Sequence, residues 1–310
     1  MSEKPREPAL RVGVVGVPGG WSSEALGEAF VARGCEVVAV DAEELRFDSE
    51  RGAVLWRDED LAALDALAIK KVGKSYGTQL LDRLELLRHV ERAGVPCFSS
   101  PARILHHLNR LSCTLALRGA GIPVPATVVA QDPRDALAAV RRFGEAVLKP
   151  VYSTKARGMR VVRAGDPDLL AELAAFHQKN PLVYVQQRVQ LPGRDLGLVF
   201  LGGEYLGSYA RVAAEGSWST TIRAGGSYAP ADPAPELIAL AHRAQALFGL
   251  DFASVDVAQT PDGPVVFEVT AFGGFRGLFE ASRLLAADRY ADYVLARVAA
   301  RRRARVGVAV

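Results

Sequence analysis

Residues 254–277, SVDVAQTPDGPVVFEVTAFGGFRG, contain the pattern that decides the fold. Two apolar runs flank Pro261-Asp262-Gly263, and this turn sequence predicts a β-hairpin. With Asp262 at the centre of the turn, Asp256 and Glu268 each stand six residues away from it. The two carboxylates then face each other across the hairpin, with Cβ atoms roughly 4.5–5.5 Å apart.

The second strand of this hairpin is expected to have one buried and one polar face. Val265, Phe267 and Val269 alternate along it, which is typical of the buried face of a strand. Because successive side chains of a strand point to opposite faces, Glu268 and Thr270 are expected on the other face. A glycine-rich turn that carries Arg276 follows.

Two facing carboxylates need an explanation, because like charges repel. At this spacing the repulsion is roughly 3–4 kcal/mol for an effective dielectric constant of about 20. The pair is tolerable if one acid is protonated or if a cation lies between them, and Mg²⁺ prefers such oxygen ligands. We therefore interpret Asp256 and Glu268 as metal ligands, with Thr270 adding a hydroxyl. The residues alone leave a second interpretation open, in which the register differs and both acids lie at a solvated edge.

Composition bounds the class of protein. The chain has 310 residues, of which 49% are hydrophobic and 24% charged, which suits two or three packed subdomains. No apolar run is long enough for a transmembrane helix, and the polar N-terminus lacks a signal region, so no membrane partner is expected. Three widely spaced cysteines favour a reducing cytoplasm over disulfides or a zinc site.

The net charge of +3 comes largely from arginines 301–303 and 305 near the C-terminus. We interpret them as a solvated basic tail. A nucleic-acid contact is the alternative, but no basic patch with interleaved aromatic residues accompanies them, so nucleic acid is not expected as a partner.

Residues 10–100 alternate between apolar strand-like and amphipathic helix-like segments, which predicts an α/β domain with a small, mostly parallel sheet. The turn VPGGW after the first strand lacks both GxGxxG and the P-loop lysine, so phosphate binding is not predicted there. Lys70 and Lys71 end a strand of this domain, where ligands of open α/β sheets bind. They are candidates for the substrate side of a site, and a solvated strand end is the alternative.

Magnesium held by few protein ligands usually also binds phosphate oxygens, so phosphate-binding elements are expected elsewhere in the chain. Lys149 ends an apolar strand directly before a proline. The following loop, residues 152–157, offers hydroxyls, Lys155, Arg157 and backbone N–H groups, and is closed by Gly158. Such a loop is suited to cover phosphates. An exposed hairpin tip is the alternative interpretation.

Five segments in order resemble the ATP-grasp superfamily, in particular carboxylate–amine ligases of the RimK and glutathione-synthetase type. These are residues 94–127 (GVPCFSSPARILHHLNRLSCTLALRGAGIPVPAT), 149–159 (KPVYSTKARGM), 183–189 (VYVQQRV), 213–227 (AAEGSWSTTIRAGGS) and 254–278 (the hairpin and the turn after it). The similarity covers residues 10–300. A finer resemblance is to the bacterial GAK-system ATP-grasp proteins.

This resemblance implies an ATP-grasp fold, in which two α+β subdomains clamp ATP behind the N-terminal α/β domain. We expect a disordered tail (1–9), an N-terminal domain (10–100), a central subdomain (101–186), a C-terminal subdomain (187–300) and the basic tail (301–310).

The resemblance also implies a role for each matching residue. Asp256, Glu268 and Thr270 would hold Mg²⁺, with Mn²⁺ as a further candidate, and the three arginines Arg211, Arg223 and Arg276 would face the reacting centre and substrate carboxylates. For each of these arginines a surface salt bridge is the alternative. ATP would be held by a larger set: Arg110, Lys149, Ser153, Thr154, Lys155, Arg157, Gly158, Gln186, Gln187, Arg188, Val189 and Asp195.

The chain departs from the family's pattern in the nucleotide and substrate regions. The metal asparagine is Thr270, two loop glycines are Ser153 and Ala156, and one arginine is Gly197. Other departures are Thr221, Gln187 and the pair Asn109-Arg110 in place of aspartate and lysine.

These observations predict an ATP-dependent ligase that joins a carboxylate to an amine through an acyl phosphate, with glutamate or another amino acid as a substrate. The substrate is expected to be a small molecule or a peptide, and the family's frequent dimers and tetramers suggest a homo-oligomer. Two alternatives are kept: a nucleotide-binding module without turnover, and an ATP-dependent phosphotransferase.

Overall fold

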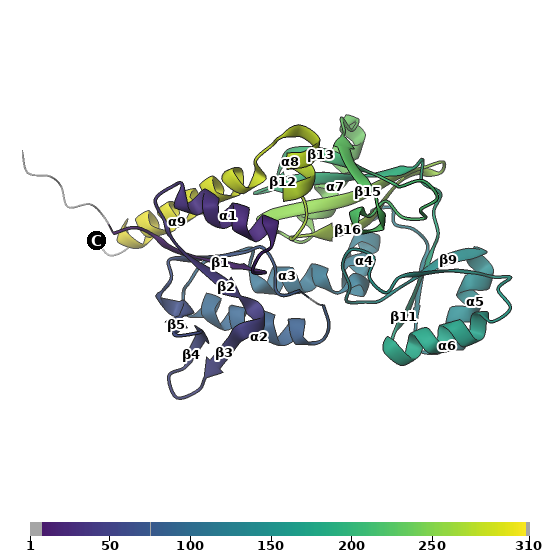
Figure 1. Cartoon of the computed structure of the whole chain (residues 1–310), viewed down its shortest axis with the longest axis horizontal. Coiled ribbons are helices and arrows are strands. Elements are labelled where there is room, and N and C mark those ends of the chain that lie inside the picture. The colour runs from purple at the N-terminus through teal and green to yellow at the C-terminus, as the bar shows by residue number, and fades with distance from the viewer. Residues whose placement is uncertain (1–7, 75, 308–310) are drawn as a thin grey trace, which may run out of the picture.

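The first sheet of the protein is parallel, as predicted for residues 10–100. The structure, a computed structural model, describes residues 8–74 and 76–307 (Figure 1). The strand order is β2-β1-β6-β7. Its strands are β1 (Arg11–Gly16), β2 (Glu36–Asp41), β6 (Ala66–Ile69) and β7 (Cys97–Phe98), and its helices are α1 (Trp21–Val31), α2 (Gln79–Arg92) and α3 (Pro101–Leu108).

A small antiparallel sheet is inserted between β2 and β6, and connects them without joining the first sheet. Its order is β3-β4-β5, and the buried Val54 and Leu55 of the middle strand anchor it. Its strands are β3 (Leu45–Asp48), β4 (Ala53–Trp56) and β5 (Glu59–Asp60), with the 3₁₀ turns η1 (Ala42–Glu44) and η2 (Leu61–Ala63) on either side.

The second sheet is antiparallel, with the order β10-β9-β11-β8, and it has a hydrophobic core of its own. Val140, Leu148 and Phe176 belong to that core, and Figure 1 shows this unit at one end of the molecule. It consists of β8 (Thr127–Ala130), α5 (Pro133–Phe143), β9 (Glu145–Lys149), β10 (Arg160–Arg163), α6 (Leu169–Lys179) and β11 (Val183–Gln187).

The third sheet is antiparallel with the order β14-β13-β12-β15-β16. Phe200 packs in one core with α7, and Val199 packs in another with α8. Neighbouring residues of a strand point to opposite faces, so the two helices cover opposite faces. The elements are α4 (Arg110–Gly119), β12 (Arg194–Leu201), β13 (Glu204–Val212), η3 (Ile222–Ala224), β14 (Ser227–Pro230), α7 (Pro235–Ala246), β15 (Phe252–Thr260), β16 (Gly263–Thr270) and α8 (Phe275–Ser282).

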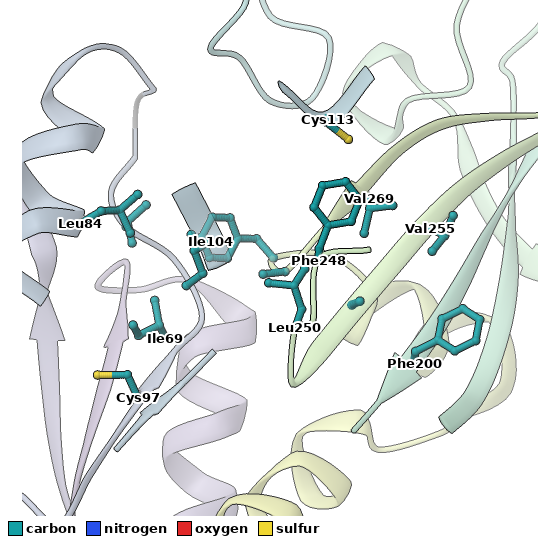
Figure 2. Close-up of a cluster of buried hydrophobic side chains, with 14 of the residues drawn as sticks. Ile69, Leu84, Cys97, Ile104, Cys113, Phe200, Phe248, Leu250, Val255 and Val269 are labelled. Atoms are coloured by element: carbon teal, nitrogen blue, oxygen red, sulfur yellow. The ribbon is translucent and has the colours of Figure 1, made fainter. Parts of the chain in front are cut away.

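The first and third sheets share one hydrophobic core, whereas the second sheet does not take part in it. Figure 2 shows this core, in which Ile69, Leu84 and Ile104 of the first unit lie in the same cluster as Phe248 and Val269 of the third. The two units are therefore packed as one body, and the second sheet has a core of its own.

Helix α9 (Ala286–Gly307) corrects the prediction of a basic tail. Residues 301–307 continue this helix, and Arg302 pairs with Asp65 at 2.5 Å. Arg33 of α1 also pairs with Asp288 of α9, at 2.9 Å. The disordered tail predicted at residues 1–9 falls mainly on residues 1–7, which lie outside the described residues. No helix within 8–74 or 76–307 has the length and apolarity needed to span a membrane.

An aromatic cluster joins α9 to the third sheet and supports a prediction about stability. The ring of Phe252 lies 4.9 Å from that of Phe275 and 5.3 Å from that of Tyr290. We expect Phe252→Ala to lower the free energy of unfolding by about 3–5 kcal/mol, because a large ring is removed from a fully packed core. Phe47→Ala, at a ring that is 50% exposed, should cost much less. Equal losses in urea denaturation would contradict this.

Candidate active site

A cleft of about 720 Å³ lies where loops of the first unit meet the third sheet. Loops at the carboxyl ends of β1 and β6 form one wall, as is usual for ligand sites of open α/β sheets. The loop between β9 and β10 also contributes. The predicted site residues that line the cleft are Arg110, Ser153, Thr154, Lys155, Arg157, Arg211, Arg223, Asp256, Glu268, Thr270 and Arg276.

The hairpin β15–β16 places Asp256 directly opposite Glu268, as predicted. The strand register that produces this opposition differs from the expected register. Thr260 pairs with Gly263, so the turn is shorter than a turn centred on Asp262, and this alone shifts the register by one residue. A β-bulge next to Asp256 adds one residue on β16 and restores the opposition.

The same bulge makes the predicted buried face of β16 wrong. Val266 and Val269 are buried, whereas Phe267 lines the cleft beside Glu268. Phe267 is the residue without a partner in the ladder, because the pairing passes from Val266 to Glu268. An extra residue interrupts the alternation of faces, which sequence periodicity cannot reveal.

Arg211 of β13 forms an ion pair with Asp256 and offsets its charge. Its Nη2 atom lies 2.8 Å from Asp256 Oδ2. The same guanidinium also donates to both carboxylate oxygens of Asp195 on the neighbouring strand. Nε donates to Oδ1 at 3.0 Å, and Nη2 donates to Oδ2. Asp195 is buried and does not line the cleft. Its contact in the structure is with Arg211, and its role in nucleotide binding stays a prediction.

Arg110 neutralises Glu268 from the side of the second sheet. It is the first residue of α4, where the Asn109 side chain caps the helix by accepting hydrogen bonds from two backbone N–H groups. Its Nη1 atom lies 3.0 Å from Glu268 Oε2, and its Nε donates to the carbonyl of Pro150 at 3.3 Å. The replacement of the family's aspartate and lysine by Asn109 and Arg110 thus keeps a cap and a cation.

The two acids differ in their pKa. Burial raises the pKa of Asp256 to about 7; Arg211 opposes this change, and the facing charges of Glu268 and Asp195 add to it. Burial also acts to raise the pKa of Glu268, but Arg110, Lys149 and Arg211 outweigh it, and the pKa lies below its usual value. The pair therefore carries less negative charge than two free carboxylates.

Magnesium fits the donor atoms that remain. In the described chain, Asp256 Oδ1 and Glu268 Oε1 accept no hydrogen bond, and both side chains line the cleft. Thr270 Oγ1 accepts the N–H of Phe272 at 3.1 Å. No cluster of three or more His, Cys, Asp or Glu ligands occurs within the described residues. Two carboxylate oxygens suit Mg²⁺, which keeps waters and phosphate oxygens in its shell.

Lys149 is buried at the end of β9, next to the acids but outside the cleft lining. Its Nζ donates to Gln186 Oε1 and lies 5.3 Å from the ring centroid of Phe267. Burial lowers the pKa of Lys149 to about 7; Arg110 adds to this, and Glu268 and Asp256 oppose it. Gln186 is buried as well and donates to Thr127 Oγ1 at 3.1 Å.

The predicted hinge, residues 187–189, lies outside the cleft lining. Two of its N–H groups are already used, because Gln187 donates to the carbonyl of Ala126 at 2.8 Å and Arg188 to that of Glu145 at 3.1 Å. The Arg188 guanidinium pairs with the Glu145 carboxylate at 2.7 Å. Among the described residues, the N–H of Val189 has no such partner, so it is the hinge donor left for a ligand.

The loop between β9 and β10 crosses towards the first unit. Arg157 donates to the carbonyl of Lys74 at 3.0 Å. Lys155 and Ala156 have positive φ angles of 57° and 54°, which L-residues adopt at a cost. Ala156 stands where the family has a glycine, so the loop lacks the residue that fits this conformation best. Gly158 has φ +72° and does not line the cleft.

Two buried residues, Lys70 and His107, hold the turn after β16 by hydrogen bonds to its backbone. Lys70 is 1% exposed rather than solvated, and its Nζ donates to the carbonyl of Gly273 at 3.0 Å. His107 of α3 accepts the N–H of Ala271 at 3.4 Å. These contacts join segments that are far apart in the sequence, so only the folded structure reveals them. Lys71, by contrast, lines the cleft as a substrate-side residue should.

Arg223 and Arg276 line the cleft from the third unit. Arg276 is on the first turn of α8 and pairs with Glu280 at 2.5 Å. Arg223 belongs to the turn η3 and has no ion pair among the described residues. Gly197, the site of a lost family arginine, has its space filled by the ring of Tyr209, which a Cβ atom there would approach to 2.3 Å.

Comparisons with known proteins identify the family. The RimK-like ATP-grasp domain matches residues 108–294, and the chain belongs to this family. Tetrahydromethanopterin:alpha-L-glutamate ligase of Methanosarcina acetivorans is 30% identical over 261 residues, which cover 76% of this chain and 81% of that protein. A probable alpha-L-glutamate ligase of Maridesulfovibrio salexigens is 27% identical over 283 residues, 88% of this chain and 91% of that protein.

Solved structures agree on the fold. A RimK-domain ATP-grasp protein from Sphaerobacter thermophilus matches with a TM-score of 0.70 and 27% identity, over 92% of this chain and 99% of that one. The ATP-grasp ligase PsnB, solved with Mg and ADP and a precursor variant, matches with a TM-score of 0.71 and 20% identity, over 94% and 99%. The predictions of an ATP-grasp fold and of an ATP-dependent ligase are confirmed.

The buried His107 gives the site a testable pH dependence. Burial lowers the pKa of His107 to about 4 from the usual 6.5. The unfolded chain therefore binds this proton at a higher pH than the folded protein does. The stability that depends on neutral His107 is present above about pH 6.5 and is lost as the pH falls towards 4, by about 3 kcal/mol.

We expect His107→Gln, which keeps an acceptor but does not titrate, to lose this part of the pH dependence of unfolding in urea. His106→Gln, at an exposed neighbour, should retain the wild-type pH dependence. If the wild type and His107→Gln have parallel stability curves between pH 7 and 4, the assignment is wrong.

Proposed function

We propose that the protein uses ATP to join a carboxylate to the amino group of an amino acid, with L-glutamate as the first candidate. The observation that carries this proposal is the pair of facing acids, Asp256 and Glu268, in a cleft whose charged lining is otherwise cationic. Eight basic residues line the cleft against these two acids. The named relatives are glutamate ligases, which supports the choice of glutamate.

The charge of the cleft suits this pair of reactants. Triphosphate and Mg²⁺ together do not offset the excess of lysine and arginine in the lining. The carboxylates of the two substrates would offset part of the remainder, and glutamate supplies two of them. Arg223 and Arg276 are the candidates for binding those carboxylates, because the arginine fork matches a carboxylate with two hydrogen bonds.

The reaction has two steps. An oxygen of the acceptor carboxylate attacks the γ-phosphorus of ATP, the bond to the bridging oxygen breaks, and ADP leaves. The amine nitrogen then attacks the acyl carbon, the carbon–oxygen bond to phosphate breaks, and the nitrogen loses a proton. Such transfer depends mainly on positioning and electrostatics, so no nucleophilic side chain is required.

The chain's own residues divide this work. Lys149 and Arg110 would stabilise the phosphate oxygens, and the loop 152–157 would cover them and exclude water. Arg211 is bound to Asp195 and Asp256 and therefore acts as a positioning residue. Mg²⁺ on Asp256 and Glu268 would offset the charge of the phosphates. The ATP-grasp ligase PsnB, which shares this fold, has been solved with Mg and ADP, and this supports Mg²⁺ and an adenine nucleotide as the ligands.

Several finer predictions stay predictions. They are membership of the GAK-system subgroup, the homo-oligomer, the cytoplasmic location, the domain boundaries, and Mn²⁺ as an alternative to Mg²⁺. The acceptor, a small molecule or a peptide, is also open to experiment.

The proposal predicts ADP release that requires both L-glutamate and a carboxylate acceptor from a panel of small molecules and peptides. We expect Asp256→Asn and Glu268→Gln to lower turnover at least about a hundredfold, because the charge that offsets the phosphates is lost. Asp262→Asn, at the exposed tip of the same hairpin, is the matched control and should retain activity. A coupled assay for ADP and mass spectrometry of the product measure this.

The product separates the alternatives. An amide supports the proposal, whereas a phosphate ester identifies a phosphotransferase. Nucleotide binding without ADP formation across the whole panel identifies a binding module. Unchanged turnover in both acid variants would remove Asp256 and Glu268 from the site.

A further inference from the structure

Lys71 stands in the cleft without an acidic partner. It follows β6 directly and lines the wall formed by the first unit. Among the described residues it makes no ion pair and no side-chain hydrogen bond. Its Nζ lies 5.3 Å from the ring centroid of Phe272, which is its one specific contact. A partly buried ammonium group without a counterion is uncommon in a finished structure, because burial of a charge is costly unless it is paired.

Tyr76 provides a second unpaired donor five residues further on. Its hydroxyl oxygen is buried and has no hydrogen-bond partner in the part of the chain that the structure describes. Its ring packs edge-on against Phe272 with the centroids 6.3 Å apart. Burial, and then the charge of Glu268, raises the pKa of Tyr76, so the hydroxyl keeps its proton and can donate it. A buried polar atom without a partner indicates strain, a missing ion or ligand, or a catalytic role.

Lys71 and Tyr76 flank the same aromatic ring and line the same cleft, so they form one group. The neighbouring charges show which ligand suits them. Lys155 and Arg157 of the loop between β9 and β10 lie near enough to lower the pKa of Lys71 to about 8, together with the larger effect of burial. The acid near them, Glu268, is paired with Arg110 at 3.0 Å. Apart from the Glu268 oxygen that the proposed Mg²⁺ site would use, the unpaired groups here are donors or cations, and the partner that suits them is an anionic oxygen.

We propose that Lys71 and Tyr76, set around Phe272, form a carboxylate subsite of the substrate on the wall of the first unit. The subsite rests on the proposed ligase function and assigns one of the substrate's carboxylates to these two donors. A nucleotide phosphate presents the same anionic oxygen. The carboxylate is favoured because both donors belong to the loop after β6, whereas Lys149 and the acids, which would hold the nucleotide, belong to the second and third sheets.

The subsite has a consequence for the ligand-free protein. An unpaired buried hydroxyl destabilises the fold, because it has lost its hydrogen bonds to water and gained none. Its removal should therefore leave the free protein as stable as before or more stable, and yet weaken substrate binding. A purely structural tyrosine would show the opposite: lower stability and unchanged binding.

The test is calorimetric binding of L-glutamate and of glutarate to the full chain saturated with Mg²⁺ and a non-hydrolysable ATP analogue. We expect Lys71→Met and Tyr76→Phe each to weaken binding of these carboxylates at least about tenfold. The affinity for the ATP analogue should be unchanged in both variants. The urea midpoint of ligand-free Tyr76→Phe should be no lower than that of the wild type.

Two exposed residues away from the cleft give matched controls: Lys179→Met at the end of α6 and Tyr205→Phe on β13 should bind both probes as the wild type does. The proposal is overturned if the wild type binds neither carboxylate, if both variants bind them normally, or if Tyr76→Phe is destabilised with binding intact. It is also overturned if the variants weaken the ATP analogue instead, because the donors then belong to the nucleotide phosphates. Binding is measured without turnover, so a failed ligase assay would not by itself produce any of these results.

Discussion

Two carboxylates held face to face, Asp256 and Glu268, are the constraint on which the site depends. Each is restrained by an arginine on its outer side, Arg211 for Asp256 and Arg110 for Glu268. These arginines come from different parts of the fold, β13 in the third sheet and the start of α4. The outer oxygens of the pair are neutralised by the protein, and the inner oxygens are left for a ligand. The arrangement resembles a binding site for a divalent ion rather than a closed salt bridge.

The packing of the sheets divides the site between two bodies. The first and third sheets share a core, whereas the second sheet has its own. The acids and the cleft wall thus belong to one body, and Lys149, the hinge and the loop 152–157 belong to the other. Arg157 reaches the first unit through the carbonyl of Lys74, which joins the two bodies on the far side of the cleft.

Much of the fold was predictable, because the alternation of strands and helices in residues 10–100 and the turn at Pro261-Asp262 act locally. The opposition of Asp256 and Glu268 was also predictable. The prediction assumed an uninterrupted register, whereas the structure reaches the same pairing through a bulge at Phe267. A bulge depends on how two strands pair, so neither periodicity nor turn position reveals it. The same holds for Lys70, His107 and Tyr76. Their roles arise from contacts, or the lack of them, with segments far away in the chain.

The structure shows what the departures from the family's pattern change in the packing and hydrogen bonding of the site. Tyr209 fills the space above Gly197, and Asn109 takes over the cap of α4. Thr270 accepts a hydrogen bond from the backbone N–H of Phe272, so the two acids are the main candidates for holding a metal ion. The site therefore relies on the facing pair more than a site with a third strong ligand would.

The most direct test of this account is the Mg²⁺ dependence of binding of a non-hydrolysable ATP analogue, measured by calorimetry on the wild type and on Asp256→Asn/Glu268→Gln. The account predicts that Mg²⁺ strengthens nucleotide binding to the wild type at least about tenfold and has little effect on the double variant. Equal strengthening by Mg²⁺ in both proteins would contradict it, because the ion would then be held by something other than the two facing acids.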